Sequence, residues 1–549
     1  MFIRTISRKN KDGSRVTYVQ LVHNERDKAK GYSKAKILYN FGRLENLDIA
    51  QLKRLVKSIS RFLPAEDALE LQAQFQHRGQ HFKWHFCRSF GGIYLLENLW
   101  QQLGFQKVLE RRIEERQFKT PVAQAIFAMV ANRCLAPSSK LAVTEWVANE
   151  VFIPGFANID VQVLYRAMDL LLLHQADFEQ ELYWATADLL HLEVDLLFFD
   201  TTSTYFETEA ESELKRRGHS KDKRPDLPQV VIGLAVTRHG IPVKHWVFAG
   251  NTQDMATIET VKNDLANWRL NRCIFVHDTG MTSESNLQYL QRGGGHYIVG
   301  RRLRSGEAEA EAALSHRGRY QEIKEHLLAK EVMVGQGERR KRLVLVKNLK
   351  EQERAESLRQ ELIETLEEKV QEVNSSRKKA QSKLAQQLKA HRIYGKYIKE
   401  LKNGELRVDY ARLQHERRYD GKYLLQSSDD TLTLEDIVLG YKQLAEVERA
   451  FRTLKTTLEI RPNYHCRDDR IRCHVFLCFI ALVLVRIVET KTDSSWSKVR
   501  NEMSRLHYGE FEIDGKKVQQ LTELTHEQKR ILHALNIKEP STVVGIHDV

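Results

Sequence analysis

Three carboxylates in this sequence have surroundings suited to metal-dependent chemistry, and two of them follow apolar runs. Asp200 ends the run VDLLFFD and leads into Thr-Thr-Ser-Thr, and Asp278 ends RCIFVHD and leads into Thr-Gly-Met-Thr. Each Asp is therefore predicted to lie where a buried strand ends, and ligand sites in such sheets gather at strand ends. Asp is also a common turn initiator or helix N-cap, so a purely local structural role remains open for both.

The third carboxylate, Glu448, lies in a long predicted helix at residues 434–460. Positions seven apart differ by about 20° around an ideal helix, so Tyr441, Glu448 and Lys455 are expected on one stripe with apolar neighbours. The pattern predicts that Glu448 faces inward, where a carboxylate needs a cation, a metal or a proton to offset its desolvation. Lys455 could be that partner in a structural ion pair.

The elements expected to position Asp200 and Asp278 occupy residues 194–303. Apolar runs separated by turn residues predict three strands, a helix, a strand, a second helix and a last strand. The first strands form a hairpin at residues 238–240, and strand and helix then alternate. This order predicts a mixed sheet of the α/β class.

The rest of the chain changes in pattern several times, which predicts further domains around this core. Alternation predicts strands near the N-terminus, and helical spacing dominates after Pro121. We predict an N-terminal α+β module (1–115), a helical domain (116–192), a first part of the core (193–304), an insertion domain of charged helices and strands (305–430), a second part of the core with the Glu448 helix (431–490) and a basic C-terminal tail (491–549).

Composition restricts the partners and the compartment. The chain has 549 residues, 86 Lys and Arg against 73 Asp and Glu, and a net charge of +13, which favours a polyanionic partner. Six cysteines in this length are too few for a disulfide framework and fit a reducing, cytoplasmic setting. The longest strongly apolar run, residues 475–485, is shorter than the roughly 20 residues of a membrane span, so a buried helix is expected.

A run of basic residues at 215–224 follows soon after Asp200 and is a candidate phosphate clamp. Its candidate contacts are Lys215, Arg216, Arg217 and Lys221. Charge runs are often only solvated loops, and that alternative remains open. The sequence contains neither a phosphate-binding G-x-x-x-x-G-K-[ST] loop nor an H-E-x-x-H zinc motif, so an ATP-driven helicase and a zinc peptidase lose their main support.

The three carboxylates and their spacing resemble those of DDE transposases from bacterial insertion sequences. In one group of this family the third carboxylate sits in a signature of Tyr, two residues, Arg, three residues, Glu, six residues, Lys. Tyr441, Glu448 and Lys455 match that spacing, whereas Leu444 stands at the Arg position. The resemblance covers about residues 194–488 and includes Asp200-Thr-Thr-Ser, Gly250-Asn251-Thr252 and Asp278-Thr-Gly.

The resemblance implies an RNase H-like catalytic core in which Asp200, Asp278 and Glu448 are both the catalytic residues and the metal ligands. It implies two Mg²⁺ ions, which Mn²⁺ can replace, with the first Asp shared between them. This agrees with two-metal phosphodiester chemistry, which needs no covalent enzyme intermediate. Tyr441 and Lys455 would contact DNA phosphate. Because Leu444 cannot bind phosphate as the signature Arg does, Arg449 and Arg452 are candidates for that role.

The partners implied are DNA, as terminal inverted repeats and target DNA, and a second copy of the chain in a homodimeric active complex near the nucleoid. No membrane partner is expected. Residues 1 to about 190 would recognise the element ends. Two alternatives remain open at this point: a metal-dependent nuclease of the same fold that cuts without joining, and a non-catalytic DNA-binding repressor derived from a transposase.

Overall fold

The computed structural model describes residues 1–10, 15–26, 33–60, 62, 83–114, 121–192, 195–266, 268, 274–304, 306–337, 340–376, 378–513 and 515–548. The chain divides into two compact units, one of residues 1–85, 510–518 and 545–549 and one of residues 86–509 and 519–544. The predicted domain boundaries at 115/116, 192/193 and 304/305 fall on or beside residues outside the described ranges.

The smaller unit begins with an antiparallel three-stranded sheet, as the alternating N-terminal pattern predicts. Its order is β1-β2-β3, with β1 at Phe2–Lys9, β2 at Arg15–Arg26 and β3 at Ser33–Arg43. Helix α1 (Ile49–Ser60) follows. Elsewhere in the chain a four-stranded sheet has the order β18-β17-β16-β4, formed by Val543–Asp548, Lys516–Leu521, His507–Ile513 and Lys83–Ser89.

The larger unit contains a helical layer whose first two helices lie before the predicted start of the helical domain. Its helices are α3 (Gly91–Gln102), α4 (Phe105–Glu114), α5 (Val122–Leu135), α6 (Lys140–Asn149), α7 (Val161–Leu173) and α8 (Gln175–Leu190). Helices α3 and α4 pack against α5 and share its apolar core, so they belong with the helical layer and not with the N-terminal module.

A nine-stranded sheet forms the centre of the larger unit, in the order β10-β11-β12-β15-β9-β8-β5-β6-β7. Strands β7, β6 and β5 are antiparallel neighbours, and β5, β8 and β9 are parallel. This arrangement confirms the predicted α/β, RNase H-like fold class. The five strands span Leu196–Tyr205 (β5), Gln229–Thr237 (β6), Pro242–Ala249 (β7), Ile274–His277 (β8) and His296–Arg301 (β9).

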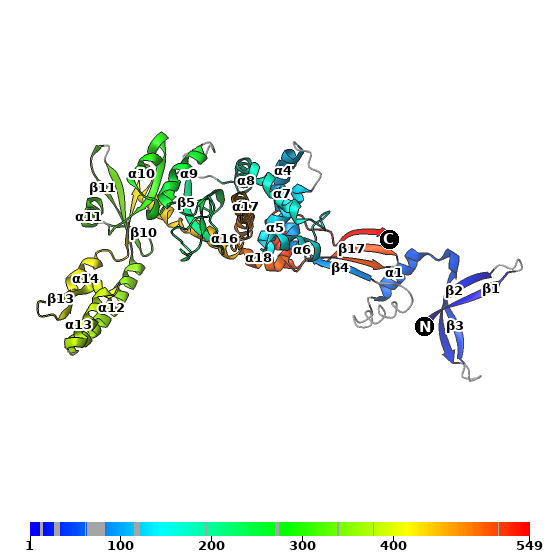
Figure 1. Cartoon of the computed structure of the whole chain (residues 1–549). Helices are drawn as coiled ribbons and strands as arrows, with labels where there is room; N and C mark the ends of the chain where they lie inside the picture. Colours follow the sequence, from blue (N-terminus) through cyan, green and yellow to red (C-terminus); the bar gives the residue numbers. More distant parts are fainter. Residues whose placement is uncertain are drawn as a thin grey trace. The chain divides into compact units, whose positions relative to one another are not determined.

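Helices cover both faces of these strands (Figure 1). One face buries Leu197 and Phe199 of β5 with α9 (Thr257–Ala266) and α10 (Glu284–Gln291). The opposite face buries Leu196 and Phe198 together with α15, α16 and α17, whose bounds follow below. Because side chains alternate along a strand, Asp200 lies on the second face.

The long helix predicted for residues 434–460 is broken, so that prediction is wrong. Helix α15 ends at Lys442 and α16 begins at Ala445, with α15 at Leu434–Lys442 and α16 at Ala445–Thr456. Leu444 is buried in the core, and the break lets each helix turn its own apolar side to the sheet. Tyr441 and Glu448 therefore lie on two separate helices and not on one continuous helix.

Helix α17 (Asp468–Thr492) is the buried helix expected from the apolar run at 475–485. By length and composition it could cross a membrane, but 94% of its most apolar window is buried within the protein. It packs against α5 and α7 of the helical layer, against α16 and against β7. Burial on all sides fits its lack of a polar stripe.

The predicted insertion domain (305–430) and the predicted C-terminal tail (491–549) differ from the structure, because strands from both segments belong to larger sheets. Strands β10 (Gln321–Lys324), β11 (Leu327–Val334), β12 (Lys341–Asn348) and β15 (Lys422–Ser427) extend the core sheet, with α11 (Ala308–Ser315) beside them. Only α12 (Leu349–Ser375), α13 (Lys378–Ala390), β13 (Ile398–Glu400), β14 (Leu406–Val408) and α14 (Tyr410–Arg417) form a separate insertion core. Residues after 490 are not a simple tail: they contain α18 (Trp496–Met503), α19 (His526–Ala534) and β16 to β18.

We predict that Gly250→Ala destabilises the fold by about 1–3 kcal/mol, because the added methyl has nowhere to go. A Cβ at Gly250 would lie 2.0 Å from the Gln229 carbonyl oxygen and 2.2 Å from that of Arg216, which are rigid backbone atoms. Gly280→Ala is the matched control, since nothing lies within 4 Å of a Cβ there. Thermal unfolding of both variants checks this, and an unchanged melting temperature for Gly250→Ala would contradict the close approach.

Candidate active site

The parallel pairing of β5 with β8 places Asp200 beside Asp278. Phe198 of β5 is registered with Val276 of β8, and the same register continued by two residues sets the two aspartates opposite each other. Phe198 and Val276 belong to the same core cluster, so both aspartates are on the face covered by α15 and α16. Asp278 follows the end of β8 as predicted, whereas Asp200 lies within β5, which continues to Tyr205.

The carboxyl group of Asp200 is held in a strongly desolvating position, with its side chain 24% exposed. Burial raises the pKa of Asp200 to about 6, and the neighbouring carboxylates of Asp254 and Asp278 act in the same direction. The Lys221 ammonium, 3.7 Å from Oδ1, and the Thr201 backbone N–H oppose this shift. A carboxylate with this excess of nearby negative charge attracts cations.

Asp254 is a further carboxylate of this site that the sequence analysis did not single out. It accepts a hydrogen bond from Thr201 Oγ1 at 2.5 Å and lies 3.2 Å from Lys221 Nζ. Lys221 also donates to the Thr201 carbonyl at 2.7 Å, so one ammonium links the two acidic side chains to β5. Asp254 lies two residues after the Gly250-Asn251-Thr252 motif, and this motif was the sequence feature that could have pointed to Asp254.

Tyr441, the candidate DNA contact at the end of α15, reaches the second aspartate. Its hydroxyl donates to Asp278 Oδ1 at 3.0 Å. Burial, together with the Asp278 charge, raises the pKa of the Tyr441 hydroxyl above its usual range, so the group remains a donor. A Cβ on Gly300 would lie 2.5 Å from this hydroxyl, so a glycine there leaves room for the tyrosine.

Glu448 does not face inward, and that prediction is wrong. Its side chain is exposed on α16, while Val447, Ala450 and Phe451 form the face that packs against β5 and β6. Across the described ranges, no three His, Cys, Asp or Glu side chains are grouped to hold a metal ion. The structure thus brings together Asp200 and Asp278 but not Glu448.

Lys455 forms an ion pair, but its partner is not Glu448. Its ammonium lies 2.9 Å from Asp222 Oδ1, and Arg461 lies 2.7 Å from Asp222 Oδ2. Asp222 is 7% exposed and follows Lys221 directly. The pair therefore fastens the end of α16 to the segment that carries Lys221, next to Asp200.

The basic run at 215–224 is a folded segment in which several cations already have partners. Arg216 and Arg217 pair with Glu211 at 3.4 and 3.1 Å. Lys215 is 4% exposed, with its ammonium over the ring of Phe206. The alternative of a solvated loop is therefore wrong for Lys215. Lys221 contacts the carboxylates of Asp200 and Asp254. By contrast, Arg449 and Arg452 are exposed on α16.

The site offers carboxylate oxygens from neighbouring strands, a lysine beside them and a tyrosine donor. Hard oxygen ligands of this kind suit Mg²⁺ and Mn²⁺ and not thiophilic metals. Such a set holds a divalent cation against a phosphate but supplies no activated nucleophile of its own.

Comparison with known families agrees with this geometry. Residues 195–484 match the family described as "Transposase DDE domain", and residues 3–70 match "IS1634 family transposase, N-terminal domain". The first match covers more than half of the chain, and the chain belongs to the DDE transposase family. The predicted insertion-sequence transposase is thereby confirmed: it is an enzyme that cleaves DNA and transfers strands with divalent metal ions.

More distant comparisons add little. No curated protein sequence matches the chain at a significant level. Among solved structures it is similar to a piggyBac transposase synaptic complex with hairpin DNA, at 10% identity and a TM-score of 0.35, over 71% of this chain and 73% of that one.

We predict that Asp200→Asn raises the melting temperature of the metal-free protein at pH 7.5. The folded pKa of about 6 exceeds the ordinary 3.8, so the stability that Asp200 contributes below pH 3.8 is lost as the pH rises through 6. Asn resembles the neutral form and escapes this loss, which is worth at most about 3 kcal/mol. Thermal unfolding in a chelator at pH 7.5 and pH 5 checks it, and the difference should shrink at pH 5.

Asp226→Asn is the control for this experiment. Asp226 is 59% exposed and its pKa is lowered by its hydrogen bonds from Arg224, so its replacement should not stabilise the protein. A melting temperature for Asp200→Asn at or below that of the unaltered protein at pH 7.5 would contradict the desolvation argument.

Proposed function

We propose that Asp200, Asp278 and Glu448 are the metal ligands with which this transposase cuts and joins the ends of an insertion sequence, using two Mg²⁺ ions. The observation that supports this most is the parallel register of β5 and β8, which sets the desolvated carboxylate of Asp200 beside that of Asp278. Glu448 is proposed on its spacing to Lys455 and its place on α16, the helix that covers the face carrying both aspartates.

The residues present fit divalent cations. Asp200 is crowded by two further carboxylates, and Lys221 alone opposes them among the side chains that shift its pKa. When bound, the two ions polarise the scissile phosphate and assist the attacking and leaving oxygens. Tyr441 fixes the orientation of Asp278 through its hydrogen bond, and Lys221 holds Asp254 and β5 together. Asp222 is paired with both Lys455 and Arg461, so its single negative charge does not neutralise both cations. Lys455 is therefore proposed as a point charge for DNA phosphate beside this region.

We expect Asp200→Asn, Asp278→Asn and Glu448→Gln each to lower strand cleavage by at least about a thousandfold while DNA-end binding is retained, because these groups act on charge that develops in the transition state. Cleavage of a labelled element end in Mg²⁺ measures this. Any one variant that keeps near-normal cleavage is thereby removed from the ligand set.

Glu446→Gln is the matched control for Glu448. Glu446 is two residues away on the same helix and lies 3.3 Å from the guanidinium of Arg486, which is 5% exposed. This variant should lower the melting temperature and leave cleavage per folded molecule unchanged. The reverse result, with cleavage abolished at Glu446 and kept at Glu448, would assign the third ligand to Glu446.

We propose that the N-terminal segment helps to recognise the terminal inverted repeats. Residues 1–45 contain eleven Lys and Arg against four Asp and Glu. Arg8 and Lys9 are exposed at the end of β1. The double variant Arg8→Ala and Lys9→Ala should therefore weaken end binding and reduce the slope of log K against log salt by about two units. Fluorescence anisotropy over a salt series checks this, and an unchanged slope would rule out phosphate contacts there.

We also propose that the active complex is a homodimer that acts on DNA at the nucleoid, since an insertion sequence has two equivalent ends to be joined. Light scattering on the chain mixed with end DNA should give the mass of two chains and two ends. A complex of one chain with one end that still performs strand transfer would overturn this.

A further inference from the structure

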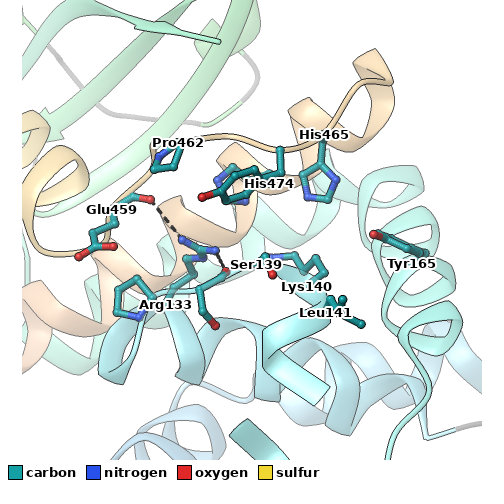
Figure 2. A pocket seen from close by; sticks show the side chains of 12 residues that line it. Arg133, Ser139, Lys140, Leu141, Tyr165, Glu459, Pro462, His465 and His474 are labelled. Carbon is teal, nitrogen blue, oxygen red and sulfur yellow. Dashed lines mark hydrogen bonds between the residues drawn. The ribbon is translucent and has the colours of Figure 1, made fainter. Parts of the chain in front are cut away.

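A cavity of about 570 Å³ lies between the helical layer and the segment that follows α16. Arg133, Ser139 and Lys140 line it on the side of α5 and α6, and Pro462, His465 and His474 line it on the other side (Figure 2). The carboxylate site described above shares none of the residues that line it.

Lys140 is the most unusual residue of this cavity. It is 4% exposed, and its ammonium nitrogen has no hydrogen-bond partner. Among the residues described, no carboxylate is one of the charged groups that shift the pKa of Lys140. Burial, and after it the charge of Arg133, lowers the pKa of Lys140 to about 7. A buried ammonium without a counter-charge is costly, so the position favours an anion that arrives from outside.

Arg133 adds a second buried cation without a carboxylate partner among the residues described. It is 5% exposed, and its guanidinium donates to the backbone carbonyls of Glu459, at 3.2 Å, and of Ser138. The Glu459 side chain is exposed, so its charge remains in solvent. Burial lowers the pKa of His465 to about 3 and holds that of His474 well below its usual range, so both rings are neutral and neither cation is repelled by them.

The beginning of α6 completes the cationic side of the cavity. Ser139 is its N-cap and accepts from the Ala142 N–H at 3.2 Å, and Lys140 is its first helical residue. The first N–H groups of a helix have no intrahelical acceptor and carry the positive end of the helix dipole. A helix N-terminus combined with a lysine is a recurring arrangement for phosphate.

We propose that this cavity binds a phosphate group of the DNA backbone, with Lys140 and Arg133 as its counter-charges. The proposal rests on the DNA-cleaving function given above. Two features favour DNA over a free anion: the side chains of Tyr165 and Tyr464 line the cavity and offer surfaces for a sugar or base, and Tyr464 is 70% exposed. Arg461 precedes the lining residue Pro462 and pairs with Asp222, which follows Lys221 of the carboxylate site, so the cavity and that site are joined by one segment.

Lys140→Met in the full chain tests this, because Met keeps the length of the side chain and removes its charge. Removal of an unpaired buried charge should raise the melting temperature in chloride buffer. Inorganic phosphate at constant ionic strength should raise the melting temperature of the unaltered chain by about 2 °C or more and should leave that of Lys140→Met unmoved. Duplex DNA affinity should fall about tenfold and the salt slope by about one unit.

Lys402→Met is the matched control, since Lys402 is exposed between β13 and β14 and its replacement removes the same charge. Equal DNA affinity and salt slope for the two variants would overturn the proposal, even if free phosphate still stabilises the protein through Lys140. An equal phosphate effect in Lys140→Met and the unaltered chain would overturn it as well. Failure here is distinguishable from failure of the carboxylate assignment, because Asp200→Asn should retain the phosphate effect in full.

Discussion

The parallel pairing of β5 with β8 is the constraint on which the geometry of the proposed catalytic site depends. It fixes Asp200 and Asp278 on the same face of the sheet, the one that α15 and α16 cover. The fold can tolerate this crowding because Lys221 and Thr201 hold the neighbouring Asp254 and because Asp200 gains its proton more readily than in solution. In the metal-free protein the like charges of these carboxylates repel one another, and divalent cations bound as proposed would relieve that repulsion.

The burial of α17 connects this sheet to the helical layer. Its apolar surface contacts α5, α7, β7 and α16, so the helices that line the cavity around Lys140 and those that cover the carboxylates share one core. Arg486, within this helix, pairs with Glu446 of α16 and Glu489. The Lys455–Asp222 pair then fastens the other end of α16 beside Lys221. A change in either region can therefore affect the other through α16.

The sequence was sufficient for the order of strands and helices in the core, because apolar runs and turn residues are local signals. It was also sufficient for Asp278 at the end of β8 and for the buried nature of α17. It was insufficient for Glu448, because the break at residues 443–444 carries no proline or glycine to mark it in the sequence. It was insufficient for Asp254 and for the strands β10 to β12 and β15. The contact of Asp254 with Lys221 and the pairing of these strands with the core sheet are tertiary contacts, which local sequence patterns do not show.

The most direct test of this account is to locate Mn²⁺ by anomalous scattering in crystals of the full chain with a cleaved element end. We expect manganese bound by carboxylate oxygens of both Asp200 and Asp278, with Glu448 turned toward it from α16. Manganese bound elsewhere, with these two carboxylates occupied only by Lys221 and solvent, would contradict it.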